Sequence, residues 1–380
     1  MSAMDSTEPF AIASREIRLA ILRKLWPKFT KEQYQETHWT RFFQYLDFEL
    51  AKLPDRRTLF SIDSRKEAIK LVDTLRHYRR SPKEDIIWAV LPKTPAHLPD
   101  PDPDPVSRSL ELAARLWLMI NIDSFKLTPS YIYTRSINVS WPENETLVDV
   151  VANHFKAENP PVRSQGIGRI RPTLTMAHLE VRHGFRVLWT HNLADHLTID
   201  WKYQTITVYE HLICLWTHVE SGEDSIIPKA ILREAIDTIN LLFPSEIRET
   251  QDFLRRHERS FWELGYCKRP RVLELDKYHY WQSNVADLID IIEGPAKGFQ
   301  QFMLDKEKRN LPEFTAFWLT VFVALLTVLG IVFGTVSTVY SIKQYNVAMA
   351  GYALQLAQAC RTPDISLPEF CEKGSGILGR

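Results

Sequence analysis

Residues 314–342 read FTAFWLTVFVALLTVLGIVFGTVSTVYSI and contain no charged side chain, between Glu313 and Lys343. An α-helix rises about 1.5 Å per residue, so a helix over this stretch exceeds the roughly 30 Å hydrocarbon core of a bilayer. Burying it in a soluble core would require apolar partners on every side, which is rare for so long a run. The stretch therefore predicts one transmembrane helix over residues 313–342 and a C-terminal tail over residues 343–380.

The apolar stretch also has the aromatic and small residues typical of membrane helices. Trp318 near one end and Tyr340 and Tyr345 near the other are placed for the two bilayer interfaces. Gly330 and Gly334 form a GxxxG pattern, on a helix face where small residues recur. Such a face lets two helices approach closely in lipid, which suggests a homodimer. The alternative is that these glycines reflect the ordinary composition of membrane helices.

Two observations predict the orientation of the helix. Residues 1–29 contain no long uncharged run, so they are not a secretory signal. The part of the chain before the transmembrane helix is therefore expected to stay cytosolic. The nearby basic residues favour the same side: Lys297, Lys306, Lys308 and Arg309 precede the helix, and Lys343 and Arg361 follow it. The tail then faces a lumen or the exterior. There, Cys360 and Cys371 either pair in an oxidising compartment or remain free thiols.

The rest of the chain is predicted to be mainly α, with one small β element. Apolar residues recurring at spacings of three and four indicate a helical N-terminal region over residues 1–98. Residues 99–105 read PDPDPDP, which favours an extended linker or a surface loop, because alternate residues lack an amide hydrogen. Ser107 then caps the first helix of a helix-rich soluble domain over residues 106–312. The β element is expected at about residues 185–211.

Two short strands around a helical turn make up this β element. Phe185–Thr190 and Thr205–Tyr209 have the composition of strands, and the turn Asn192–Leu197 lies between them. Gly184, just before the first strand, is placed to end a helix in the left-handed conformation. Residues 132–141 alternate well enough to predict a further strand.

Three blocks of the sequence resemble a known family. They are Ala113–Asn121, Leu174–His211 with NLADHL at 192–197, and Phe314–Tyr345. On these blocks the chain resembles the uncharacterised single-pass membrane proteins that filamentous fungi carry in many copies per genome. The resemblance implies a topology and a taxon, and no activity, substrate or partner. The tail departs from the usual pattern, because it continues well past the apolar stretch. The motif residues are Asn192, Leu193, Asp195, His196 and Leu197.

Charge and motif content argue against several classes of function. Lys plus Arg and Asp plus Glu both number 47, so no overall field favours nucleic acid. The sequence has no Walker A motif, GxGxxG, HExxH, EF-hand loop or CxxC pair. We therefore predict no nucleic-acid partner, no cofactor and no bound metal, and we name no catalytic residue.

A histidine-rich segment nevertheless leaves a chemical alternative open. His191, Asp195 and His196 are close enough in sequence to suggest metal ligands, although their spacing matches no zinc pattern. A hydrolase or a metal-dependent enzyme would then have its site near Asp195 and His196. In the structural interpretation, which we favour, Asn192 caps a turn and Asp195 and His196 bond to the backbone.

Three arginines in a loop with glycine and proline, Arg163, Arg169 and Arg171, suggest an anion site. Guanidinium groups pair bidentately with phosphate oxygens, so the loop would suit a phosphate or an anionic lipid headgroup. The alternative is an ordinary solvated loop.

A last alternative concerns transport. Two-helix magnesium channels of the CorA type also place a helical cytosolic domain before C-terminal membrane helices. This chain has neither a second apolar span nor a Gly-Met-Asn sequence. With no catalytic set, the sequence favours a cytosolic helical interaction module tethered to a lipid bilayer. Its partner would be another protein or a second copy of the chain.

Overall fold

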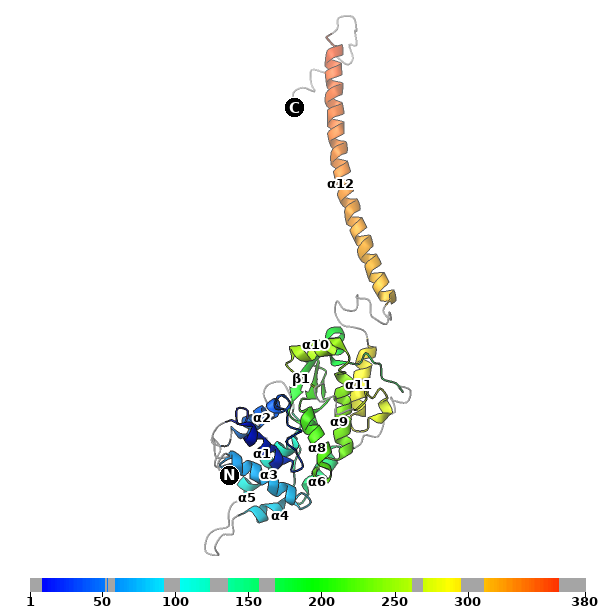
Figure 1. The fold of residues 1–380 in the computed structure, drawn as a ribbon. Coiled ribbons are helices and arrows are strands. Elements are labelled where there is room, and N and C mark those ends of the chain that lie inside the picture. The colour runs from blue at the N-terminus through cyan, green and yellow to red at the C-terminus, as the bar shows by residue number, and fades with distance from the viewer. Residues whose placement is uncertain are drawn as a thin grey trace. The chain divides into compact units, whose positions relative to one another are not determined.

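The computed structural model describes residues 9–51, 53, 59–91, 103–123, 136–156, 168–261, 269–294 and 311–361 (Figure 1). The chain divides into two compact units, Met1–Lys297 and Gly298–Arg380. The first unit is mainly α with a small three-stranded sheet, and the second contains one long apolar helix. The predicted fold class is confirmed.

The helices of the first unit follow the apolar periodicity of the sequence. Ser64 begins one of them, since its Oγ accepts a hydrogen bond from the Glu67 amide at 3.2 Å. Gly184 ends another in the left-handed conformation, with φ 73°. The helices are α1 (Arg15–Leu25), α2 (Glu36–Leu50), α3 (Arg65–His77), α4 (Lys83–Val90), α5 (Pro103–Leu118), α6 (Leu147–His154), α7 (Met176–His183), α8 (Leu212–Ser221), α9 (Lys229–Leu242), α10 (Arg248–Arg256) and α11 (Gln282–Glu293).

The proline- and aspartate-rich segment differs from its prediction. Helix α5 begins at Pro103, inside the predicted linker and before the expected cap at Ser107. Proline is tolerated in a first helical turn, where the amide groups lack intrahelical partners in any case. Helix α3 packs against α5, so the predicted boundary at residues 99–105 falls inside one compact unit.

The sheet consists of β1 (Arg186–Thr190), β2 (Ile199–Asp200) and β3 (Thr205–Tyr209), in the order β1-β3-β2. Strands β1 and β3 are parallel, with Thr190 opposite Tyr209 at their carboxyl ends, and β2 is antiparallel to β3. The strand predicted over residues 132–141 is wrong where the structure describes it. Residues 136–141 make only the isolated bridge Ile122↔Val139. Residues 132–135 lie outside the described residues.

A single hydrophobic core runs through the first unit and joins its N-terminal helices to the later ones. The Trp26 ring lies 5.6 Å from Trp39 and 5.5 Å from Phe42, centroid to centroid, on α2. His218 of α8 meets the same Trp26 ring edge-on at 5.3 Å. Such aromatic pairs stabilise by about 0.5–1.5 kcal/mol each beyond the area they bury. Phe42 and Tyr45 of α2 also lie 6.4 Å from His211 and 5.0 Å from His191, between ring centroids, so α2 lies beside the carboxyl ends of β1 and β3.

The second unit contains helix α12 (Leu311–Ala359), which is 49 residues long. Its stretch Phe314–Ala359 is long and apolar enough to cross a membrane, and none of its most apolar window is buried. The helix continues well beyond Ile342, where the sequence analysis ended it. Residues 344–359 are rich in alanine, leucine and glutamine and contain no proline, so a single lysine at 343 does not stop the helix.

Candidate functional site

The motif residues 192–197 form the tight connection between β1 and β2. Asn192 Oδ1 accepts hydrogen bonds from the Ala194 amide at 3.2 Å and from the Asn121 amide at 2.9 Å. Its Nδ2 donates to the Ile137 carbonyl at 2.8 Å. Asn192 therefore caps a short 3-10 turn and ties two other chain segments to it. Leu193 and Leu197 are buried in the core.

Asp195 fixes the segment that contains Ser136 and Ile137. Its Oδ1 accepts from the Ile137 amide at 2.6 Å and its Oδ2 from the Ser136 hydroxyl at 2.9 Å. Burial raises the pKa of Asp195, although these hydrogen bonds lower it. The side chain borders a cavity of 620 Å³ over the sheet, which Trp201 also lines. His191 and His196 are not among the lining residues.

His196 is buried and bonds to two neighbouring elements. Its Nδ1 accepts from the Tyr209 amide at 3.2 Å, and its Nε2 lies 2.7 Å from Thr238 Oγ1. Burial lowers the pKa of His196 to about 3, so the ring is neutral at physiological pH. Asp195 and His196 thus face different partners, and the structure does not join them with His191 in one ligand set.

His191 instead meets two residues that follow the parallel strand. Its Nδ1 lies 2.7 Å from His211 Nε2 and 2.9 Å from Glu210 Oε1, and the last two atoms are 4.0 Å apart. Among the described residues, these three side chains are the one group of histidine, cysteine and acidic residues arranged to hold a metal ion. We call it the His191 cluster.

The electrostatics of the His191 cluster follow from its depth. Burial raises the pKa of Glu210, but its hydrogen bond with His191 and the nearby cations, Arg259 among them, bring it down to about 2. Arg259 Nη2 lies 2.8 Å from Glu210 Oε2. Burial also lowers the pKa of His211 to about 3, which outweighs the opposite effect of Glu210. The cluster therefore combines a carboxylate with a neutral imidazole.

The register of the sheet brings the His191 cluster together. Thr190 is opposite Tyr209 in parallel strands, so residues 191 and 210–211 emerge at the same edge. Carboxyl ends of parallel strands commonly collect functional groups in this way. Sequence reasoning considered His191 and missed Glu210 and His211, because the parallel pairing of β1 and β3 is not visible in the sequence.

The predicted arginine site is only partly described. Arg163 lies outside the described residues. Arg171 pairs with Glu293, with Nη2 3.4 Å from Oε1, and the backbone of Arg169 forms a bridge with Glu274. The described part of the loop thus offers ion pairing and backbone pairing.

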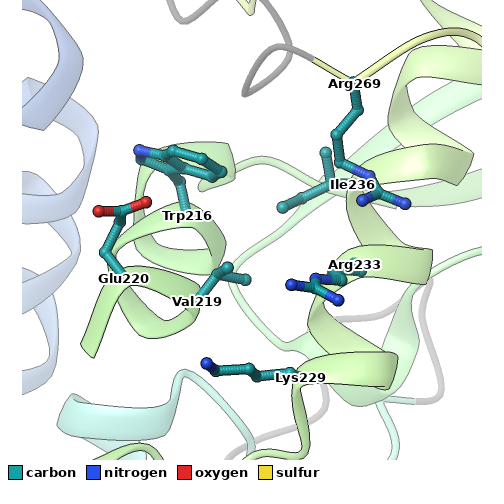
Figure 2. A pocket seen from close by; sticks show the side chains of 7 residues that line it. All are labelled: Trp216, Val219, Glu220, Lys229, Arg233, Ile236 and Arg269. Atoms are coloured by element: carbon teal, nitrogen blue, oxygen red, sulfur yellow. The ribbon is translucent and has the colours of Figure 1, made fainter. Parts of the chain in front are cut away.

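A different cationic pocket lies between α8 and α9, with a volume of 390 Å³ (Figure 2). Arg233 and Arg269 direct their guanidinium groups to the same side of it, and Glu220 lies on the opposite side. Arg269 also pairs with Asp237 through two bonds, of 2.6 and 2.5 Å. The full lining is Trp216, Val219, Glu220, Lys229, Arg233, Ile236 and Arg269. Because Asp237 offsets the charge of Arg269, the excess charge of the lining comes from Lys229 and Arg233 against Glu220, and this excess suits an anionic ligand.

Helix α12 leaves its GxxxG face open. A Cβ atom added to Gly330 or Gly334 would meet nothing within 4 Å. Cys360, immediately after the helix, is disulfide-bonded. Cys371, the partner considered in the sequence analysis, lies outside the described residues.

Comparison of the chain with models of known families, with curated proteins and with solved structures found no match. The resemblance to the fungal membrane-protein family therefore stays a prediction, and function has to be argued from the geometry of the chain itself.

Proposed function

We propose that the protein is a single-pass membrane protein that holds its helix-rich first unit at the cytosolic surface of a bilayer as an interaction module. The observation that supports this is the exposure of α12, whose apolar side chains are covered by nothing in the described chain. Moving one leucine or phenylalanine side chain out of water stabilises by about 1.5–3 kcal/mol. Lipid provides that environment for the whole helix at once.

Two observations support the proposed orientation. The disulfide at Cys360 fits a lumenal or extracellular tail, because disulfides persist in oxidising compartments and are rare in the cytosol. The excess of lysine and arginine before the helix favours a cytosolic first unit.

Washing membranes with alkaline carbonate tests the anchor directly. We expect the full-length chain to remain in the membrane pellet, and a Leu329→Arg variant to be released in larger part, since arginine at a helix centre opposes insertion by about 2.5–3.5 kcal/mol. In sealed microsomes, protease should remove an N-terminal epitope and spare a C-terminal one. Release of the wild-type chain into the supernatant, or the reverse protection pattern, would contradict the proposal.

The geometry favours an interaction module over the enzyme and transport alternatives. The polar atoms of Asp195 and His196 bond to protein groups, which leaves them poorly disposed to act on a substrate. In the part of the chain that the structure describes, one helix alone is long and apolar enough to span a membrane, whereas channels of the CorA type use two.

A second candidate function, binding of an anionic group by the first unit, is favoured by the pocket of Figure 2. Lys229 and Arg233 are exposed and one helical turn apart on α9, so both can turn toward a bound anion. A hydrogen bond to a charged group contributes about 1.5–3 kcal/mol, so loss of either cation should weaken binding at least about tenfold.

Calorimetric titration of the detergent-purified chain with inorganic phosphate tests this second function. Lys229→Ala and Arg233→Ala should weaken binding, and Arg186→Ala, an exposed arginine on β1 outside the pocket, should not. Equal affinities in all four proteins would contradict it.

A further inference from the structure

We propose that His191, Glu210 and His211 bind a divalent transition-metal ion, best fitted by Zn²⁺, with one coordination position open to solvent. The proposal is independent of the membrane anchor, because all three residues belong to the first unit.

The identity of the donors fits zinc. Two imidazole nitrogens and one carboxylate oxygen face one another, which is the His₂Glu set of many zinc sites with an open position. Zinc binds such donors at about 2.0–2.2 Å, so tetrahedral ligands stand about 3.3 Å apart.

The distances between these donors bracket the value that zinc requires. The separations of 2.7 and 2.9 Å from His191 Nδ1 are shorter, and the 4.0 Å between His211 Nε2 and Glu210 Oε1 is longer. An outward shift of the His191 ring would lengthen the two short separations, and a turn of the Glu210 carboxylate toward His211 would shorten the long one.

A proton accounts for the cluster less well than a metal ion does. His191 Nδ1 is within hydrogen-bonding distance of both the second imidazole and the carboxylate. One ring hydrogen can point well at only one of these two groups. A metal ion in its place would contact all three donors at once. The His211 Nε2 atom and the Glu210 carboxylate oxygen already lie within reach of the same point as His191 Nδ1.

Exposure differs sharply among the three ligands. The side chains of Glu210 and His211 are 4% and 1% exposed, and that of His191 is 44% exposed. Two donors are therefore fixed in the protein, while the third lies at the surface, where an ion can enter and a water molecule can complete the coordination. Three protein ligands plus water is the arrangement of open zinc sites.

Neighbouring side chains hold the ligands in place. Arg259 Nη2 forms an ion pair with the second carboxylate oxygen of Glu210, at 2.8 Å, which favours the orientation of the first toward the two histidines. The Tyr45 ring packs 5.0 Å from the His191 ring and 5.9 Å from the His211 ring, between centroids. Because Arg259 offsets the charge of Glu210, the occupied site would stay positively charged and would favour water, hydroxide or an anionic group in the open position.

Metal binding by the full-length chain, purified in detergent without a histidine tag, tests the proposal. After treatment with a chelator and dialysis against Zn²⁺, elemental analysis should find one ion per chain. With Co²⁺ in place of Zn²⁺, the protein should gain the visible absorption of a four-coordinate site. His191→Ala, at the exposed position, should weaken Zn²⁺ binding by more than about 100-fold, beyond the loss expected for an outer-shell residue.

Two further variants keep the result interpretable. Glu210→Gln should also lose the ion, and His77→Ala, an exposed histidine on α3 outside the cluster, should retain it. Circular dichroism and thermal melting establish that each variant is folded. The proposal is overturned if the wild-type chain retains no Zn²⁺, or if folded His191→Ala binds Zn²⁺ and Co²⁺ as the wild type does.

Discussion

Lys83 Nζ lies 2.6 Å from Glu111 Oε1, and the two side chains are only 2% and 3% exposed. Lys83 also donates to the Trp141 carbonyl at 3.2 Å, so the pair joins α4, α5 and the chain segment before α6. A buried charge that loses its ionic partner destabilises a protein far more than the pair stabilises it.

We therefore expect Lys83→Met to lower the free energy of unfolding by about 3–5 kcal/mol. The double variant Lys83→Met, Glu111→Leu should recover most of this loss, because no carboxylate then remains buried beside an apolar side chain. Chemical denaturation of the detergent-solubilised chain, followed by tryptophan fluorescence, measures both. A double variant less stable than the single one would refute this account.

The turn at residues 192–197 gives the second prediction. Asp195→Ala removes the acceptor of the Ile137 amide and of the Ser136 hydroxyl, so it should destabilise the first unit by about 1–3 kcal/mol. Asp200→Ala, an aspartate of β2 with local bonds to residues 202 and 203, serves as the control and should have a smaller effect. If Asp195→Ala leaves the midpoint of unfolding unchanged, the turn does not depend on this carboxylate.

The pH dependence of stability follows from His218. Burial lowers the pKa of His218 to about 4, although its hydrogen bond to the Trp117 carbonyl raises it. The unfolded chain, with a pKa of about 6.5, then binds more protons than the folded one below that pH. Stability is full above about pH 6.5 and falls, by up to about 3 kcal/mol from this residue, as the pH drops toward 4.

His218→Gln should accordingly flatten the dependence of unfolding free energy on pH between 6.5 and 4. Denaturation curves at half-unit steps of pH measure it, and His77→Gln, an exposed histidine, is the control. An unchanged slope for His218→Gln would show that other groups set the acid sensitivity.

Self-association through α12 is the fourth prediction. Gly334→Leu should abolish crosslinked dimers in membranes, because the added side chain fills the space into which a second helix would pack. Gly351→Leu lies on the same helix outside the GxxxG pattern and should leave crosslinking intact. A wild-type chain that stays monomeric in membranes would rule out this mode of pairing.

Local signals in the sequence predicted several elements well. The uncharged run before Lys343 indicated a long helix, and Gly184 marked the end of α7. In each case the decisive chemistry lies within a few residues of the chain, so no tertiary information is needed. The two principal strands were predicted for the same reason.

Features that depend on tertiary contact were not predicted. Helix α5 begins at Pro103 and packs against α3, and the local proline pattern reveals neither of these features. The His191 cluster depends on the parallel register of β1 and β3, and the pocket of Figure 2 joins Arg233 to Arg269 from a distant segment. Sequence spacing alone instead grouped His191 with Asp195 and His196, whose side chains bond to other parts of the fold.

Helix α12 has no break from Leu311 to Ala359. At about 1.5 Å per residue it measures about 74 Å, so a hydrocarbon layer of roughly 30 Å would enclose less than half of it. The remainder would stand in water or among headgroups as a stiff rod. On the proposed topology, a tilt or rotation imposed at Leu311 would be transmitted along this continuous helix to the disulfide at Cys360 on the far side, and it would couple the two faces of the membrane mechanically.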